Sequence, residues 1–224
     1  PTQAQVDAFL PPYEPRQVLD PSEPVSIGAM VGPEAFTEVR YLAHAKQMQA
    51  LELIPQIAAE FKQAFGRDSG GLVRPYRIED AETVVVALGS LLGTIKDTVD
   101  QLRDEGHKIG VLGISSFRPF PIPDIRDALE KTQRIVVVEK CFAVGIGGIV
   151  SRDVRMALRN RPQPVSTVVA GLGGRAVTVA SLRKMALYRN VRPLYLEQHG
   201  DRDAVLKLAE DLLVSTGTVQ AGDM

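Results

Sequence analysis

The stretch that decides the fold is Thr83-Val84-Val85-Val86-Ala87-Leu88, which is followed directly by Gly89-Ser90. A continuous run of apolar and β-branched residues is typical of a strand buried on both faces, as a parallel sheet requires. Similar runs recur at residues 107–112, 134–139 and 165–170. Strands that alternate with helices predict an α/β fold, with a doubly wound, largely parallel sheet of the Rossmann-like three-layer type.

Helical patterns fill the gaps between these runs. The predicted helices span about 91–105, 123–131, 149–160 and 178–188, and Thr178 is the predicted N-cap of the last one. Further on, residues 191–196 are predicted to form a short edge segment, and residues 203–213 a terminal amphipathic helix.

The chain before the sheet divides into two predicted parts. Residues 1–32 hold six of the fifteen prolines and are expected to be an extended lead-in that packs along a surface. Residues 33–72 are expected to be a long helix packed on the domain, with a kink or a break at Pro55. Residues 73–224 then form the α/β domain.

Composition excludes several classes of protein. The 224 residues are 45% hydrophobic and 24% charged, with a formal net charge of −1, so an overall polybasic nucleic-acid binder is excluded. Cys141 is the one cysteine, which excludes an internal disulfide and any cysteine-ligated iron–sulfur cluster on this chain. No apolar run reaches the roughly 18–20 residues of a membrane span, and no signal peptide is visible. A cytoplasmic location is expected.

Charge is distributed unevenly. Residues 151–192 carry nine Lys and Arg residues against the single acid Asp153. There are two interpretations of this stretch. In the first it faces phosphates or an acidic partner, and in the second it is a solvated helix face with interface salt bridges. The second interpretation is the simpler one.

Each predicted strand is followed by an unusual loop, and ligands of such sheets bind beyond the carboxyl ends of the strands. We therefore expect the four loops to cluster at one edge and to offer contacts to a partner or an anion. The candidate contact residues are Gly89, Ser90, Gly93, Thr94, Arg118, Phe120, Gly145, Gly147, Gly173, Gly174 and Arg175.

No catalytic constellation accompanies these loops. The glycines form neither a complete dinucleotide fingerprint nor a P-loop, and tight turns explain them more simply. Cys141 has no nearby histidine and is expected to be an inert packing residue. His44, His107 and His199 lie far apart and are expected to be structural, so no catalytic or metal-ligating residue is assigned. A self-contained nucleotide- or CoA-binding module remains the alternative.

The ordered set of loop motifs carries a resemblance. It comprises Gly89-Ser90…Gly93-Thr94, Phe117-Arg118-Pro119-Phe120-Pro121, Val136-Val137-Val138-Glu139-Lys140, Gly145…Gly147-Gly148 and Gly171-Leu172-Gly173-Gly174-Arg175. In this order the motifs resemble the transketolase C-terminal-like domain of the 2-oxoacid:ferredoxin oxidoreductases, and most closely the α subunit of the pyruvate enzymes. The opening stretch from Val6 to Tyr13 resembles the segment that leaves that subunit's thiamine-pyrimidine domain.

The resemblance implies a function for the assembled enzyme. Such enzymes convert pyruvate and CoA to acetyl-CoA and CO2 and pass electrons through iron–sulfur clusters to ferredoxin. The implied cofactors, thiamine diphosphate, Mg and iron–sulfur clusters, lie on other domains or subunits, and none is expected on this chain. The implied partners are the thiamine-diphosphate-binding β subunit, the γ subunit and the ferredoxin-like δ subunit, or their fused equivalents, with ferredoxin and CoA reached through the holoenzyme.

The resemblance assigns this chain the part of a non-catalytic scaffold that is inactive alone, with neither nucleic acid nor membrane as a partner. The diphosphate motif of thiamine enzymes, Gly-Asp-Gly followed by Asn, is absent from the sequence. The C-terminal domain of another thiamine-dependent enzyme is a second alternative, because it would share this fold.

Overall fold

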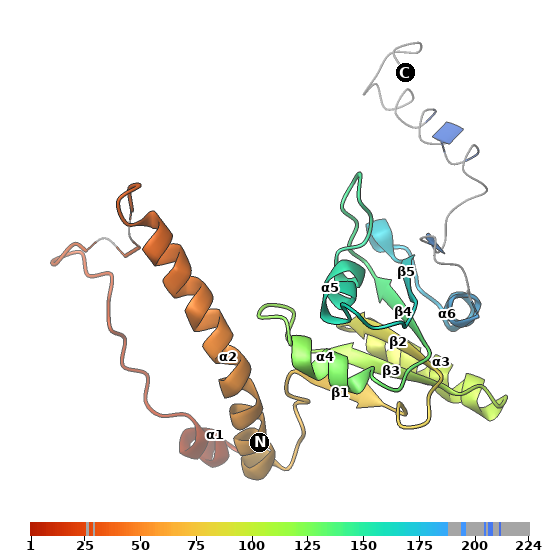
Figure 1. The fold of residues 1–224 in the computed structure, drawn as a ribbon. Coiled ribbons are helices and arrows are strands. Elements are labelled where there is room, and N and C mark those ends of the chain that lie inside the picture. Colours follow the sequence, from red (N-terminus) through yellow and green to blue (C-terminus); the bar gives the residue numbers. More distant parts are fainter. Residues whose placement is uncertain are drawn as a thin grey trace. The chain divides into compact units, whose positions relative to one another are not determined.

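A computed structural model (Figure 1) describes residues 1–25, 27–28, 30–187, 194–195, 204, 206–207 and 211. The contacts within the chain divide it into two units. One unit contains residues 1–74 and 114–124, and the other contains residues 75–113 and 125–224. Most of the predicted edge segment at 191–196 and of the predicted terminal helix at 203–213 lies outside the described residues.

The described residues form a sheet of six strands in the order β1-β3-β2-β4-β5-β6. The strands are β1 (Val73–Tyr76), β2 (Thr83–Leu88), β3 (Ile109–Ile114), β4 (Arg134–Glu139), β5 (Val165–Val169) and β6 (Leu194–Tyr195). Strands β2, β4, β5 and β6 pair in parallel, with Val86 opposite Val137. The middle residues of β2 and β4 are buried, as their apolar runs predicted.

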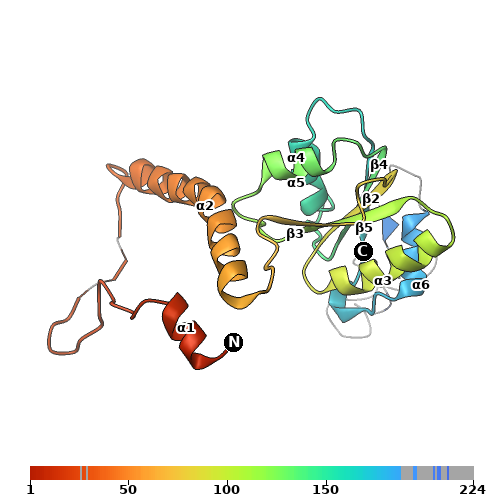
Figure 2. The ribbon, with the colours of Figure 1, turned by 90° about the horizontal axis from the view of Figure 1, so that it is seen from below.

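Helices cover both faces of this sheet (Figure 2). Helices α3 (Leu91–Asp104) and α6 (Val179–Ala186) pack together on one face, and α4 (Ile122–Ala128) and α5 (Val150–Ala157) lie on the other. On the first face, buried side chains of α3 and α6 meet those of the strands in one apolar cluster that includes Val99 and Leu182. The predicted doubly wound α/β fold is confirmed.

Two strands differ from their predictions. Strand β1 was missed, because Val-Arg-Pro-Tyr is short, half polar and interrupted by Pro75, as edge strands often are. Strand β3 begins at Ile109 and not at residue 107, because His107 and Lys108 are exposed polar residues of the turn after α3. It continues to Ile114, so all six of its residues are buried.

The smaller unit holds two helices, α1 (Gln3–Phe9) and α2 (Phe36–Phe65). Helix α1 corrects the prediction that residues 1–32 are extended throughout. The prolines constrain the chain only from Pro11 onward, and before them Thr2 and Gln5 form a capping box that starts a helix. The ring of Phe9 then packs edge-on against that of Phe65, with 5.1 Å between the centroids.

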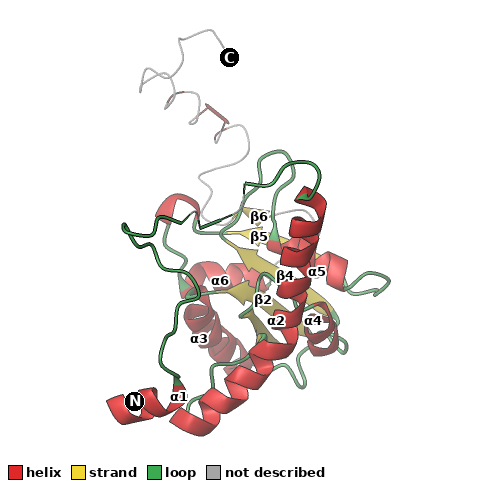
Figure 3. Cartoon of the chain, turned by 90° about the vertical axis from the view of Figure 1, so that its left-hand side faces the viewer, coloured by secondary structure: helices red, strands yellow, loops and turns green. Residues whose placement is uncertain are grey.

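A kink or a break was predicted at Pro55. Helix α2 (Figure 3) is one helix of 30 residues, so no break occurs, and its axis bends along its length in Figure 2. A proline inside a helix removes one backbone hydrogen bond. Here Pro55 is exposed, and water can satisfy the freed carbonyl of Leu51. The helix ends where predicted, at Gly66, whose φ of 66° is in the left-handed region.

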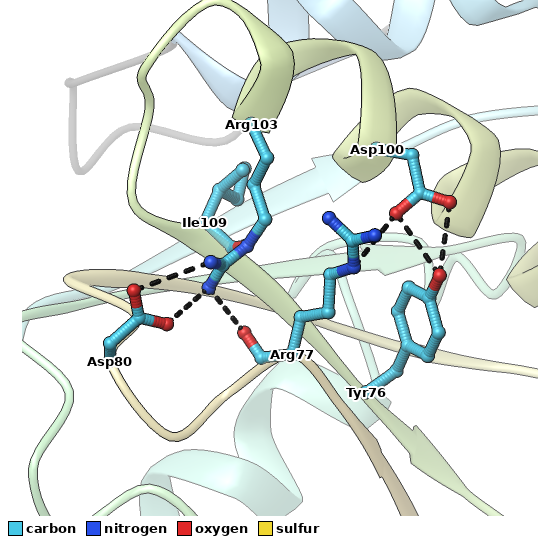
Figure 4. Close-up of polar contacts among 6 residues, drawn as sticks. All are labelled: Tyr76, Arg77, Asp80, Asp100, Arg103 and Ile109. Carbon is cyan, nitrogen blue, oxygen red and sulfur yellow. Dashed lines mark hydrogen bonds and ion pairs between the residues drawn. The ribbon is translucent and has the colours of Figure 1, made fainter.

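A charged network fixes the turn between β1 and β2 (Figure 4). Arg103 donates to the carbonyls of Arg77 and Ile109 at 2.7 and 2.6 Å, and to the Asp80 carboxylate at 2.6 Å. Beside it, Asp100 accepts from the Tyr76 hydroxyl at 2.9 Å and pairs with Arg77 at 3.1 Å. The network ties α3 to the amino-terminal edge of the sheet, at the opposite end from the loops considered next.

Candidate contact edge of the sheet

The parallel strands bring three of the predicted loops to one edge. Leu88 at the end of β2 is level with Glu139 at the end of β4, since Val86 is opposite Val137. The end of β5 lies beside them, with Val169 opposite Glu139. The candidate residues Gly89, Ser90, Gly93, Thr94, Gly145, Gly147, Gly173, Gly174 and Arg175 therefore belong to neighbouring loops. Arg118 and Phe120 lie in the smaller unit and are described by themselves.

Glu139 makes the central side-chain contact at this edge, and sequence reasoning missed that contact. It is the last residue of β4, only 3% exposed, and its Oε2 accepts from the backbone N–H groups of Ile149 and Val150 at 2.7 Å each. Its Oε1 accepts from the N–H of Ser151 at 3.1 Å. A carboxylate at a helix N-terminus is favoured by the helix dipole and by charge-assisted hydrogen bonds. The amides with which α5 would bind a phosphate are thus occupied by the chain itself.

Gly148 leaves the room that this carboxylate needs. A Cβ at position 148 would collide with Oε1 of Glu139 and would lie 2.6 Å from Oγ of Ser151. The signal in the sequence was therefore an acid at the end of an apolar strand together with a glycine just before the next helix. Burial lowers the pKa of Arg155 on α5, and the nearby charge of Glu139 opposes that shift.

Residues 140–148, which we call the apolar hairpin, project beyond the end of β4 (Figure 1). Ala143 and Gly147 exchange two backbone hydrogen bonds of 2.8 Å, and Gly145 and Gly147 have φ of 85° and 92°, which explains both glycines. The tip carries Val144, which is 90% exposed, and Ile146, which is 61% exposed. Cys141 is exposed as well, so the prediction that it is a packing residue is wrong.

The loop after β5 lies against the base of this hairpin. The Cε atom of Lys140 is 2.9 Å from the position of a Cβ on Gly171. Gly173 and Gly174 have φ of 63° and 81°, and Arg175 after them is exposed. The loop leads to Thr178, which caps α6 as predicted.

The capping of α6 is reciprocal. The N–H of Ser181 donates to Oγ1 of Thr178 at 3.2 Å, and the N–H of Thr178 donates to Oγ of Ser181 at 2.9 Å. The N-cap of α6 and the amide of Ser181 in its first turn are therefore bonded to side chains of this protein.

The loop after β2 leads into α3, whose N-terminus has no side-chain cap. Gly89 has a φ of 70°, and Ser90 stands at the N-cap of α3 without a side-chain hydrogen bond. The carbonyl of Thr94 accepts from the hydroxyl of Thr98 at 2.7 Å, and Gly93 has free space where a Cβ would be. These candidate residues shape the start of α3, and contact with a partner or an anion stays a prediction for them.

The remaining candidates, Arg118 and Phe120, belong to a self-packed loop. The Arg118 guanidinium lies 4.1 Å from the ring centroid of Phe117 and 5.8 Å from that of Phe120. The buried hydroxyl of Ser116 donates to the carbonyl of Pro119 at 2.8 Å. Both rings are half-buried, whereas Arg118 is exposed. The loop therefore presents a cation stacked on two aromatic rings.

The described part of the chain contains no group of three or more His, Cys, Asp and Glu residues that could hold a metal ion. His44 and His107 are exposed on separate elements, and His199 lies outside the described residues. Among the described helices, none combines the length and the apolar character that crossing a membrane requires.

Comparison with known proteins identifies the family. Residues 81–182, from just before β2 into α6, match the family model described as pyruvate:ferredoxin oxidoreductase core domain II. Pyruvate synthase subunit PorA of Methanosarcina barkeri is 41% identical over 182 residues, which cover 80% of this chain and 45% of that protein. The chain belongs to the 2-oxoacid:ferredoxin oxidoreductase family. The resemblance drawn from the loop motifs is thus confirmed.

Other members of the family are similar to a lesser degree. Ketoisovalerate oxidoreductase subunit VorA of Pyrococcus horikoshii is 36% identical over 187 residues, which cover 82% of this chain and 48% of that protein. Among solved structures, the 2-oxoglutarate:ferredoxin oxidoreductase of Magnetococcus marinus is 19% identical, with a TM-score of 0.42. The match covers 56% of this chain and 20% of the chain of that structure. The chain spans about half the length of the curated relatives it matches.

Proposed function

We propose that this chain is a non-catalytic scaffold and assembly domain of a 2-oxoacid:ferredoxin oxidoreductase α subunit. The holoenzyme would convert pyruvate and CoA to acetyl-CoA and CO2 and pass the electrons to ferredoxin. Membership of the family supports this proposal, as does the similarity to subunits named pyruvate synthase PorA. The division into a lead-in at 1–32, a helix at 33–72 and an α/β domain at 73–224 is part of the same proposal.

The observation that carries the scaffold role is that side chains of this chain cap the N-termini of α5 and α6 at the contact edge. In α/β folds such N-termini bind the phosphates of ligands. Here the carboxylate of Glu139 accepts from three amides of α5, and the Thr178–Ser181 pair caps α6. A phosphate at α5 would have to displace a buried carboxylate of the same charge, so the N-terminus of α5 is poorly suited to a diphosphate or to CoA.

The residues present also do not fit the implied cofactors. An iron–sulfur cluster is held by several thiolates, and Cys141 is the single cysteine of the sequence. Among the described residues, no three or more His, Cys, Asp and Glu side chains lie together as a metal site made of protein ligands alone would require. We therefore propose that the thiamine diphosphate, Mg and iron–sulfur clusters of the holoenzyme lie on other domains or subunits. Neither a nucleotide-binding module nor the domain of another thiamine enzyme is favoured by a specific observation.

Calorimetry and reconstitution test the proposal. The chain alone is expected to bind thiamine diphosphate with Mg, and CoA, no more tightly than about 1 mM, or roughly −4 kcal/mol. Pyruvate-dependent reduction of ferredoxin should require the other subunits. Glu139→Ala is the matched comparison, because it frees the amides of α5 without touching the other loops. Micromolar binding of either ligand by the unaltered chain would refute the scaffold role.

A further inference from the structure

The apolar hairpin, residues 140–148, is held in place at two points. At its start, the Glu139 carboxylate binds the amides of Ile149 and Val150, which joins the two ends of the loop. Nearer its tip, the two hydrogen bonds between Ala143 and Gly147 close the turn. A loop fixed in this way loses little conformational freedom when a partner binds it. The hairpin is thus preorganised for contact.

The tip of the hairpin is apolar and open to solvent. Val144, Ile146 and Phe142 are 90%, 61% and 39% exposed, all within five residues of chain. Single exposed apolar side chains are ordinary, but a group of them on one fixed projection is typical of an interaction site. Because the group projects from the edge, it suits insertion into a pocket of a partner.

The charges around the tip restrict the partner further. The loops at residues 140–149 and 170–178 contain Lys140 and Arg175 and no aspartate or glutamate. Arg152, in the first turn of α5, is exposed and adds a third positive charge. Of the two carboxylates close to the hairpin in sequence, Glu139 is buried under the amides of α5, and Asp153 follows Arg152 in the first turn of that helix. Among these described residues, the positive charges of Lys140, Arg175 and Arg152 outnumber the one partly exposed carboxylate of Asp153, which makes the surface beside the hairpin complementary to acidic side chains.

We propose that the apolar hairpin docks the chain onto another subunit of the oxidoreductase, with Val144 and Ile146 filling an apolar pocket that has an acidic rim. This inference rests on the proposed function and names the surface through which the scaffold would assemble. Small clusters of buried side chains dominate the affinity of protein interfaces. Two aliphatic side chains on a rigid turn, beside Phe142, have the size of such a cluster.

Cys141 provides a direct probe, because it is the single cysteine, is exposed and lies at the base of the hairpin. Its rate of reaction with a maleimide is measured in the free chain and in the complex with the other oxidoreductase subunits, copurified from the native host. We expect assembly to slow labelling at least tenfold. An unchanged rate in the complex would overturn the docking proposal.

A matched set of variants measures the contribution of the tip. Val144→Ser with Ile146→Ser is expected to raise the dissociation constant of the complex about 100-fold, or about 2.8 kcal/mol, at an unchanged melting temperature of the free chain. Leu187→Ser is the control, because Leu187 is 55% exposed but lies beside Thr83 and Arg134 at the opposite edge of the sheet. Lys140→Gln should weaken the salt dependence of binding.

The outcomes separate the two proposals. If the unaltered chain forms the complex and the tip variant binds within threefold of it, the docking proposal fails and the scaffold role stands. If the unaltered chain does not associate with the other subunits, the proposed function itself fails. If the tip variant melts at a lower temperature, its weaker binding no longer tests the docking proposal. The labelling rate of Cys141 in the unaltered complex then tests it, because slower labelling supports the proposal and an unchanged rate overturns it.

Discussion

The substitution Gly148→Ala tests the internal capping of α5 most directly. Gly148 does not have a positive φ, so alanine suits its backbone and space is the only obstacle. The added methyl group would collide with Oε1 of Glu139 and crowd Oγ of Ser151. Because both belong to buried residues, the carboxylate must move away from the amides that it binds.

The size of the effect follows from the hydrogen bonds at risk. Glu139 accepts three, two to Oε2 and one to the crowded Oε1. A hydrogen bond to a charged group contributes about 1.5–3 kcal/mol net, so losing the Oε1 bond and weakening the others should cost about 2–4 kcal/mol. For a chain of this length, 3 kcal/mol lowers the melting temperature by about 6–12 °C. Such a loss is a large part of a typical folding free energy of about 5–15 kcal/mol.

The assay is thermal and urea unfolding of four proteins: the unaltered chain, Gly148→Ala, Glu139→Ala and the double variant. Without the carboxylate there is nothing for the methyl group to displace, so Gly148→Ala should cost less than about 0.5 kcal/mol in the Glu139→Ala background. Gly93→Ala is the control for glycine substitution itself. It has open space within α3 and should stabilise the chain by about 0.5–1 kcal/mol.

Two results would refute this reasoning. One is a cost of Gly148→Ala that is the same with and without Glu139, because the collision would then not involve the carboxylate. The other is a cost below about 0.5 kcal/mol in the unaltered background, within the usual range of surface substitutions. Hydrogen exchange adds a local measurement, since the amides of Ile149, Val150 and Ser151 should lose protection in Gly148→Ala.

Three further predictions concern charged residues. The hydrogen bond that Asp80 accepts from Arg103 lowers the pKa of Asp80 from its ordinary value of 3.8. The contribution of this pair to the folding free energy is therefore complete above pH 3.8 and is lost as the pH falls through the lower pKa of the folded state. Asp80→Asn should therefore flatten the acid side of the stability curve below about pH 4 in melts between pH 7 and 2, and an unchanged slope would count against the pair. Arg118→Ala with Phe120→Ala should weaken subunit assembly at a constant melting temperature of the chain, whereas a large drop would mean that this loop supports its own core. Arg175→Lys should also weaken assembly with the fold intact, because lysine lacks the planar fork of arginine; an assembled enzyme whose Michaelis constant for CoA rises about tenfold, or about 1.4 kcal/mol, would instead assign Arg175 to a phosphate.

The sheet was readable from the sequence because its central strands are buried on both faces. The run Val84–Leu88 and its counterparts have one stable location, the middle of a parallel sheet covered by helices. Edge elements carry weaker signals. Strand β1 contains Arg74 and Pro75, and its pairing depends on neighbours distant in the sequence, so local propensity could not reveal it. Helix α1 was not predicted because the prolines that follow Phe9 favour an extended chain, and this preference was extended to the residues before them.

The contact edge was predicted in outline and not in its central contact. Four loops were expected at one edge, and the parallel register brings the loops after β2, β4 and β5 there. The placement of the loop after β3 stays a prediction. The clamp between Glu139 and Ser151 spans twelve residues and depends on the packing of α5 against β4, which local patterns do not encode. The exposure of Val144 and Ile146 was not predicted, because the glycines between and after them are also typical of loops that bind ligands.

A glycine-rich loop between a parallel strand and a helix has two physical explanations, and the last residue of the strand helps to separate them. Where that residue is neutral, the amides of the next helix remain open to a phosphate. Where it is a buried acid, as Glu139 is, the chain supplies the anion itself, and a glycine such as Gly148 makes room for a carboxylate and not for a ligand. The loop is then a rigid projection, and the groups that it can still offer to a binding partner are its exposed side chains. On this argument the contact edge is more suited to a protein surface than to a cofactor, which is why subunit assembly is the decisive measurement.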